Sequence, residues 1–476
     1  MQISLPRSML LWFDRHSVAL QRMFIVPAVL LISYVLAPKL DPLQAVVLMA
    51  IPFVFLGVVS LFRWPAMGLL LLLAGSLAFA QEIISNIGLT TIITMGLTGL
   101  WVFDFVVKKG ALKIVLSPVY RPIIGLIIVA FFSFGLGQLP WYPLKPAPID
   151  SQLGGILIYI VAFLIMFLAA NHIKTVLWLK WVTFTFIALS AVFLAGWLVP
   201  PLGNITGQVY SYLIPSNGMF WCWLAAMSFS QGFFNKKLHL VWRGSLLGVA
   251  AVVLLITLFQ TRAWVSGWMP TLVTFIVIIW IGAPKMAYVV SLLAAAGVGT
   301  QMNAILENFI YVGDNSYSEV TRLAAWGIII KMVKANPFFG LGPANYSFYT
   351  PLFPILGWNV QFNSHNNYVD IIAQTGILGI LCFLWIFWEV GRLGWRMILR
   401  VRHREGFARA YVYGVMGGFA ATVVGGMLGD WVLPYVYNIT IRGMRASMLP
   451  WLFFGGLIAL NTILDRQEQA DPVSNS

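Results

Sequence analysis

The stretch LGGILIYIVAFLIMFLAAN, residues 153–171, contains no charged residue. A membrane-spanning α-helix needs about 20 mainly apolar residues to cross the hydrocarbon layer. Within lipid, only a helix or a closed barrel satisfies every backbone polar group. The stretch therefore predicts a transmembrane helix.

Thirteen more apolar segments of similar length predict a polytopic membrane protein. With the first, the segments are 22–38, 43–62, 65–82, 86–107, 121–139, 153–171, 175–199, 217–234, 243–260, 264–281, 285–303, 371–391, 408–428 and 446–463. The predicted fold class is all-α with about fourteen transmembrane helices, or twelve to fourteen if one or two segments re-enter the membrane without crossing it.

The composition agrees with a membrane protein. Hydrophobic residues make up 60% of the 476 residues and charged residues 9%, against roughly 25% charged in soluble domains; the mean hydropathy is +0.88. If the N-terminus is cytoplasmic, 21 of the 29 Lys and Arg residues fall on the cytoplasmic side. This positive-inside bias explains most of the net charge of +14, so we expect cytoplasmic termini, contact with membrane lipids and no nucleic-acid partner.

One connection is long and divides the chain. Residues 304–370 join the eleventh predicted helix to the twelfth on the outer face, and they are too rich in aromatic and aliphatic residues for a disordered tail. Loops of this length are usually functional. The predicted organisation is eleven transmembrane helices in 1–303, an outer-face loop with active-site helices in 304–370, three more transmembrane helices in 371–465 and a cytoplasmic tail in 466–476.

The loop itself contains a predicted helix, SYSEVTRLAAWGIIIKMVKANP at 316–337. Ser316 and Glu319 have the spacing of a capping box, and the helix should end before Pro337. One face of this helix should point toward protein or membrane rather than water; it is formed by Arg322, Trp326, Ile329 and Val333. A glycine turn, FFGLGPANY, follows, and Asn363 or Ser364 is the expected cap of the next helix.

Three residues on the predicted outer face are candidates for chemistry: Arg262, Arg322 and His365. Arg262 lies between two apolar segments, where a charge is costly and often functional, although an interfacial Arg also extends to lipid headgroups. Arg322 has a structural alternative as the ion-pair partner of Glu307 or Glu319. His365 has one as a hydrogen-bonding residue at a helix start.

Together the three suggest transfer of a group away from a pyrophosphate. Arginine binds phosphate oxygens with two parallel hydrogen bonds, and a neutral His accepts a proton from a hydroxyl near pH 7. Negative charge grows on the departing phosphate oxygen, so fixed cations there stabilise the transition state more than the ground state.

The order of three motifs resembles the signature region of the O-antigen ligase and polymerase superfamily. The motifs are QTRAW, TRLAAWGIIIKMVKANPFFGLGPANY and SHNNYVDIIAQTGILG, within roughly residues 255–385. They supply an Arg after a membrane helix, an R-x-x-x-W helix, a P-x-x-G-x-G turn, and H-N followed by Q-x-G-x-x-G. The remainder of the chain is similar only as an array of membrane helices.

The resemblance implies a GT-C-like glycosyltransferase in the cytoplasmic membrane of a bacterium. It would transfer a glycan from an undecaprenyl-pyrophosphate carrier to a hydroxyl of a glycan or lipid-anchored acceptor on the outer face, without a cofactor or metal ion. Arg262 and Arg322 would engage the pyrophosphate, and His365 would contact or deprotonate the acceptor, with Asn366 of the H-N motif beside it. Ligases and polymerases share these motifs, so both activities stay open.

Further residues have both a structural and a substrate-binding interpretation. Trp326 either packs or stacks on a sugar, and Arg442 and Arg445 bind either carrier phosphate or lipid headgroups. Gly376 and Gly379 are expected to allow close helix packing.

Two other functions fit parts of the pattern. A GT-C transferase that uses a lipid-phosphate sugar would place an acid in the first outer loop, where Asp41 is available, although Asp41 is also an ordinary turn residue. A flippase for lipid-linked oligosaccharides would show related halves and charges at the bilayer midplane, and neither is clear here. The outer loops hold no D-x-D pair, and Cys222 and Cys382 lie in apolar segments, so we expect no metal site and no disulfide framework.

Overall fold

The computed structural model describes residues 55–78, 87–107, 114–210, 214–305, 307 and 315–470. The chain divides into two compact units, residues 1–64 and 65–476. In the first unit, the described part is a helical stretch at 55–63. The predicted span 22–38, most of the predicted span 43–62 and Asp41 lie outside the described residues.

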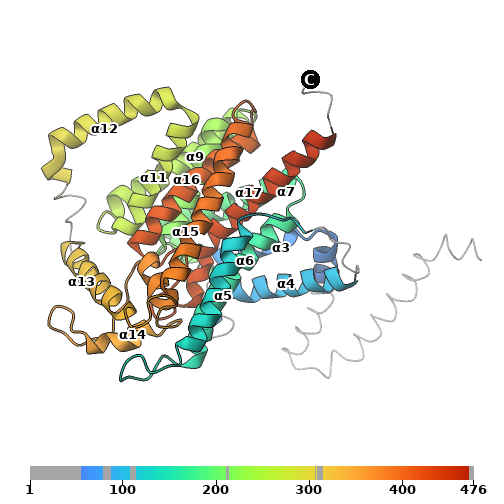
Figure 1. Cartoon of the computed structure of the whole chain (residues 1–476). Coiled ribbons are helices and arrows are strands. Elements are labelled where there is room, and N and C mark those ends of the chain that lie inside the picture. Colours follow the sequence, from blue (N-terminus) through green and yellow to red (C-terminus); the bar gives the residue numbers. More distant parts are fainter. Residues whose placement is uncertain are drawn as a thin grey trace, which may run out of the picture. The chain divides into compact units, whose positions relative to one another are not determined.

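The second unit is built from helices (Figure 1). They are α3 (Met67–Leu77), α4 (Leu89–Val107), α5 (Tyr120–Leu136), α6 (Ile149–His172), α7 (Val176–Leu198), α8 (Pro200–Val209), α9 (Gly218–Phe234), α10 (Leu240–Leu255), η2 (Ile256–Gln260), α11 (Val265–Gly282), α12 (Pro284–Ile305), α13 (Asn315–Val333), α14 (Tyr346–Tyr349), η4 (Thr350–Leu352), α15 (Asn367–Val401), α16 (Phe407–Leu428), η5 (Ile441–Gly443) and α17 (Met444–Ala470).

Eight helical segments among the described residues are long and apolar enough to cross a membrane. They are α4, α6, α7, α10 with η2, α11, α15, α16 and η5 with α17. The predicted spans 65–82 and 121–139 form the shorter apolar helices α3 and α5. The predicted spans 217–234 and 285–303 form the helices α9 and α12, which do not belong to these eight segments. The prediction of an all-helical, multi-pass membrane protein is confirmed.

The centre of the second unit is the packing of α9 against α10, α11 and α16. Nearly all of α9 is buried, and the indole of Trp223 stacks on Phe453 of α17 with ring centroids 5.0 Å apart. The indole N–H of Trp223 donates to Thr422 Oγ1 of α16 over 3.2 Å. A buried indole needs such a partner, so this bond fixes how α9 and α16 face each other.

The long helix α15 connects two ends of the second unit. Its 35 residues span about 50 Å at 1.5 Å per residue, which exceeds the ~30 Å hydrocarbon layer. At its C-terminal end Arg400 makes ion pairs with Asp465 at 2.7 Å and Glu468 at 2.6 Å, both from α17. Asn367 begins the helix at the opposite end, where α13 packs against it (Figure 1).

A break in α15 docks the predicted glycine turn. Gly376 has φ 66° and ψ −162° inside the helix, and the freed carbonyls of Ala373 and Gln374 accept from Leu341 N–H at 2.9 Å and Gly342 N–H at 3.2 Å. The prediction of a glycine turn is confirmed, since Gly340 and Gly342 both have positive φ.

Gly376 permits close packing, as predicted, but against the 337–342 loop rather than a neighbouring helix. A Cβ at this position would meet the Phe338 carbonyl. At Gly379 the three atoms nearest to an added Cβ all belong to Thr375, one turn earlier in the same helix, so close helix packing at Gly379 stays a prediction.

The cap of α15 also differs from the prediction. Asn366, rather than Asn363 or Ser364, is the N-cap: its Oδ1 accepts from Tyr368 N–H at 2.9 Å and Val369 N–H at 3.3 Å. The helix therefore begins at Asn367, four residues before the predicted span 371–391. An apolar run locates the lipid-facing part of a helix but not the polar first turn that precedes it.

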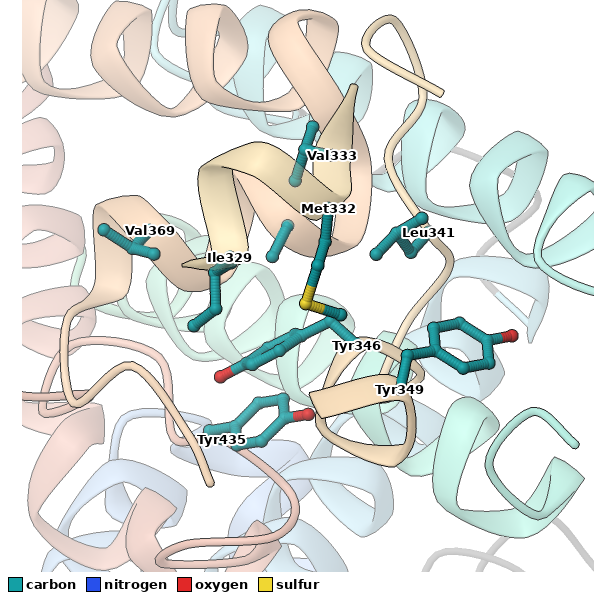
Figure 2. Close-up of a cluster of buried hydrophobic side chains, with 9 residues drawn as sticks. Ile329, Met332, Val333, Leu341, Tyr346, Tyr349, Val369 and Tyr435 are labelled. Carbon is teal, nitrogen blue, oxygen red and sulfur yellow. The ribbon is translucent and has the colours of Figure 1, made fainter. Parts of the chain in front are cut away.

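A buried cluster holds α13, the glycine turn and the start of α15 together (Figure 2). Its members are Ile329, Met332, Val333, Leu341, Tyr346, Tyr349, Val369, Ala373 and Tyr435. The ring of Tyr346 stacks on Tyr435 at 4.9 Å between centroids. Ile329 and Val333 are buried and Arg322 and Trp326 half-buried, which confirms that this face of α13 points toward protein.

Candidate functional site

An open pocket lies between α13 and the loop that precedes α15. Its volume is about 580 Å³. One part of its lining is polar or charged, and the other is apolar. The lining residues are Thr321, Arg322, Ala325, Ile355, Leu356, Trp358, Val360, Gln361, Phe362, Asn363 and His365. Arg322 and His365, predicted from separate motifs, therefore meet in one pocket.

The apolar wall of the pocket includes a tight turn at residues 355–358. Ile355 and Trp358 exchange two backbone hydrogen bonds of 2.9 Å across Leu356 and Gly357, which both have positive φ. A positive φ is energetically costly for a leucine. The Trp358 side chain is 71% exposed and lines the pocket. The pocket thus offers apolar surface beside a cation, which suits an amphiphilic ligand.

Arg322 is half-buried on α13 and held by the end of α16. Its Nη1 donates to the Leu428 carbonyl at 3.3 Å. Burial lowers the pKa of Arg322, and the nearby Asp430 opposes that shift. An arginine remains protonated at neutral pH even so, and Asp430, rather than Glu307 or Glu319, is the acid that acts on it.

His365 lies on the pocket wall with an unusual backbone. Its φ is 46°, a left-handed conformation that is uncommon outside glycine but enriched among Asn, Asp and His. Burial lowers the pKa of the imidazole, and the charge of Arg322 lowers it further. Both effects favour the neutral ring at pH 7.

The residues beside His365 are fixed by a buried carboxylate. Asp370, only 2% exposed, accepts from the Tyr346 hydroxyl at 2.5 Å and the Ser364 hydroxyl at 2.7 Å through Oδ1. The Tyr346 oxygen in turn accepts from Ser364 N–H at 3.1 Å. The strained backbone at His365 is thus anchored on its N-terminal side, with Asn366 as the helix cap on the other.

Replacing Tyr346 with phenylalanine should therefore destabilise this end of the protein. Ser364 N–H loses its buried partner and Asp370 Oδ1 keeps only the Ser364 hydroxyl; a buried group left unsatisfied costs about 1–3 kcal/mol. The matched control is Tyr349→Phe in the same cluster: among the described residues, its buried hydroxyl has no hydrogen-bond partner. Thermal unfolding of the purified protein should show a lower Tm for Tyr346→Phe only; equal Tm values would contradict the anchoring role.

Two further residues at the site were not predicted from sequence. Asp430, 1% exposed, accepts from Tyr435 N–H at 2.9 Å and from Asn438 Nδ2 at 2.7 Å. The same Asn438 Nδ2 lies 3.3 Å from His365 Nδ1. Burial raises the pKa of Asp430, and its hydrogen bonds and Arg322 counteract part of that rise. Asp430 could have been identified from sequence as a lone acid directly after an apolar segment. No sequence pattern identifies Asn438.

Arg262 lies in the turn between η2 and α11 and does not line the pocket. Its carbonyl accepts from the indole of Trp268 at 3.2 Å, and its side chain is exposed. Ser266, in the first turn of α11, donates to the Leu428 carbonyl at 2.7 Å, the same oxygen that Arg322 contacts. Arg262 is therefore at the same end of the helices as the pocket.

Trp326 and Asn366 also lie outside the pocket lining. The indole of Trp326 donates to the Ser364 carbonyl at 2.8 Å, and Asn366 is 4% exposed with its Oδ1 used in the cap. In this structure, both residues support the segment that carries His365.

Arg442 and Arg445 are placed near α3 and α4 rather than on the pocket. Arg445 is fully buried and its Nη1 donates to the Ser76 carbonyl of α3 at 3.4 Å. Arg442 is partly exposed, and its backbone lies against Gly88, just before α4.

Residues 239–384 match the family model described as O-antigen ligase. This range contains Arg262, Arg322 and His365, together with α13 and the pocket-lining loop at 355–365. The chain carries an O-antigen ligase domain. The comparison with curated proteins found no match.

The match shows similarity to O-antigen ligases over the segment that contains α13 and the loop before α15, which is less than half of the chain. Asp430 and Asn438 follow the matched range, so these two neighbours of His365 lie outside the O-antigen ligase domain. Within the described residues, no cluster of three or more His, Cys, Asp or Glu side chains suitable for a metal ion is found.

Proposed function

We propose that this protein transfers a glycan from undecaprenyl pyrophosphate to an acceptor hydroxyl, as an O-antigen ligase. The observation that carries the proposal is the meeting of Arg322 and His365 in one pocket inside the O-antigen ligase domain. The pocket opens at the end of α15 opposite the Arg400 ion pairs, and the charge bias of the sequence assigns the Arg400 end to the cytoplasm. The reaction therefore takes place on the extracytoplasmic face of the bacterial cytoplasmic membrane.

The charges at the pocket suit the departure of a pyrophosphate. Arg322 remains charged while half-buried, so it is less screened by water than a surface cation. As the bond from the sugar to the pyrophosphate breaks, the negative charge on the phosphate oxygen increases and Arg322 binds it more strongly. Arg262, at the same end, would contact the distal phosphate, and His365 the acceptor.

The other parts of the proposed enzyme have supporting roles. The apolar wall around Trp358 suits the carrier chain or an apolar sugar face, and Trp326 would approach the glycan through its half-buried edge. Arg442, which is partly exposed, would bind carrier phosphate or a lipid headgroup near the N-terminus of α17, whereas Arg445 is fully buried against α3 and has a structural role instead. The fold would be GT-C-like, with twelve to fourteen transmembrane helices in the whole chain.

Reconstitution tests the reaction class. Proteoliposomes that contain the protein, an undecaprenyl-pyrophosphate glycan and a candidate acceptor should release undecaprenyl pyrophosphate and form an extended acceptor. The rate should be unchanged by a divalent-metal chelator, because Arg322 and Arg262 supply the positive charge. Chelator-sensitive transfer would contradict this mechanism, and transport of the lipid-linked glycan without release of the carrier would instead indicate a flippase.

The acceptor separates ligase from polymerase. A ligase extends a lipid-anchored core sugar, whereas a polymerase joins the glycan to a second carrier-linked repeat unit. The family covers both activities. Offering the two acceptors separately, with the same donor, should give product with the lipid-anchored core; product only with the carrier-linked repeat would assign the polymerase.

A further inference from the structure

The amide of Asn438 joins Asp430 to His365 in one fixed orientation. Its Nδ2 lies 2.7 Å from Asp430 Oδ1 and 3.3 Å from His365 Nδ1. An ionised carboxylate only accepts hydrogen bonds, so the atom of Asn438 that faces it must be the NH₂ group, which only donates. The second N–H of that group is then directed to His365.

We propose that Asn438 fixes the proton of His365 on Nε2, so that the ring acts on the substrate as a hydrogen-bond donor and not as a general base. A hydrogen bond from Asn438 requires a lone pair on Nδ1. In the neutral ring, the one remaining proton is then on Nε2, which is the nitrogen left for a ligand in the pocket. This inference deepens, and rests on, the proposed glycan transfer.

At His365 the hydrogen bond on Nδ1 runs in the opposite direction to that of a catalytic carboxylate–histidine pair. Where a carboxylate accepts directly from Nδ1–H, the ring is left with a basic Nε2. Here an amide is interposed between Asp430 and the ring, so Nδ1 meets a donor. Asn438 is accordingly a positioning residue, and Asp430 acts through it by fixing its orientation.

The charges around the ring favour the same neutral state. Arg322 on α13 is a cation that faces His365 and opposes its protonation. The two acids are both held by other groups: Asp430 by Tyr435 N–H and Asn438, and Asp370 of α15 by the Tyr346 and Ser364 hydroxyls. A second proton on Nδ1 would face the donor of Asn438, so protonation breaks that hydrogen bond.

The reaction balances without a protein base. The bond from the sugar carbon to the pyrophosphate oxygen breaks, with its electron pair on that oxygen, and the acceptor oxygen bonds to the same carbon. The hydroxyl proton of the acceptor passes to the departing pyrophosphate, which Arg322 holds beside it. His365 Nε2–H donates to a substrate oxygen throughout and returns unchanged.

Substitutions of His365 distinguish a donor from a base. Glutamine places an amide N–H close to the position of Nε2 but cannot take up a proton, so His365→Gln should keep turnover within about tenfold of the wild type. His365→Ala should lose about 10²–10³-fold, the usual cost of one donor to developing charge. A folded His365→Gln protein as inactive as His365→Ala would overturn the proposal.

Asn438→Asp provides an independent variant if glutamine is not tolerated at the positive φ of position 365. An aspartate accepts from Nδ1–H, which moves the ring proton off Nε2 and leaves a basic nitrogen. Turnover should fall at least tenfold under the proposal. Turnover equal to or above that of the wild type would show that a basic Nε2 is what the reaction needs.

The pH profile of turnover distinguishes a donor from a base. Protonation of the ring adds a proton on Nδ1 and leaves Nε2–H in place, and the pKa of His365 is already lowered, so the wild type and His365→Gln should share the same acid side of the pH profile. A loss of turnover at low pH that occurs in the wild type and vanishes in His365→Gln would indicate a base and would contradict the proposal.

Nitrogen NMR on ¹⁵N-histidine protein, assigned by comparison with His365→Gln, should show Nε2 protonated and Nδ1 bare at pH 7.5. A protonated Nδ1 would overturn the tautomer even if transfer occurs. Conversely, absence of any glycan transfer by the wild type, with the predicted NMR signature present, would reject the proposed function but not the role of Asn438 in fixing the ring.

Discussion

Replacing Arg322 with alanine is expected to lower glycan transfer by about 10²–10³-fold, the effect of removing one preorganised group that faces developing negative charge. Most of the loss should appear in kcat, because the charge that Arg322 meets is greatest in the transition state. Arg322→Lys should recover only part of the activity, since lysine keeps the charge but not the planar fork that binds two phosphate oxygens.

The fold should survive this substitution, which makes the loss interpretable. The Leu428 carbonyl that Arg322 contacts also accepts from Ser266 at 2.7 Å, so no buried acceptor is left without a donor. Lys331→Ala is the matched control, an exposed cation on the same helix that is absent from the pocket lining. Steady-state release of undecaprenyl pyrophosphate measures both; equal turnover in the two variants would remove Arg322 from the site.

Gly376→Ala is expected to prevent the protein from folding to a stable state. The backbone there has φ 66° and ψ −162°, a combination that is essentially confined to glycine. A Cβ would also collide with the Phe338 carbonyl, a backbone atom that cannot rotate away. The backbone strain and the collision add, so we expect the free energy of unfolding to fall by more than about 4 kcal/mol, a larger loss than most single substitutions cause.

The control for this prediction is Gly327→Ala on α13. A Cβ at Gly327 meets nothing within 4 Å, and alanine is favoured over glycine inside a helix by about 0.5–1 kcal/mol. Fluorescence-detected size exclusion after heating should show Gly376→Ala aggregated and Gly327→Ala as stable as the wild type or slightly more so. A monodisperse Gly376→Ala protein with an unchanged Tm would contradict the docking of the 337–342 loop on α15.

The helices of this protein could be predicted from sequence because lipid imposes one rule on every span. An uncharged run such as 153–171 has few alternatives to a helix, and the structure forms α6 there. The ends of helices follow local hydrogen bonds instead, which explains why α15 begins at Asn367 with Asn366 as its cap. The break at Gly376 was missed because a glycine in an apolar segment is compatible with a continuous, closely packed helix.

Part of the candidate site could also be predicted from the pattern of apolar residues. Arg322 could be found because it shares a helical face with buried residues, and His365 because it precedes an apolar segment. Asn438 could not be found, since its contact with His365 joins positions 73 residues apart and an exposed-loop asparagine has no pattern of its own. Arg445 is fully buried against α3, a placement that its position before an apolar segment does not reveal.

The most direct test of the central claim is a double-mutant cycle on kcat/KM for glycan transfer. It compares wild type, Arg322→Ala, His365→Ala and the double variant in the same proteoliposomes. If both residues act on one substrate in one pocket, the double variant should lose at least tenfold less than the product of the two single losses, because groups that act as a unit are not additive. Strictly multiplicative losses, or wild-type transfer by the double variant, would contradict the assignment of this pocket as the transfer site.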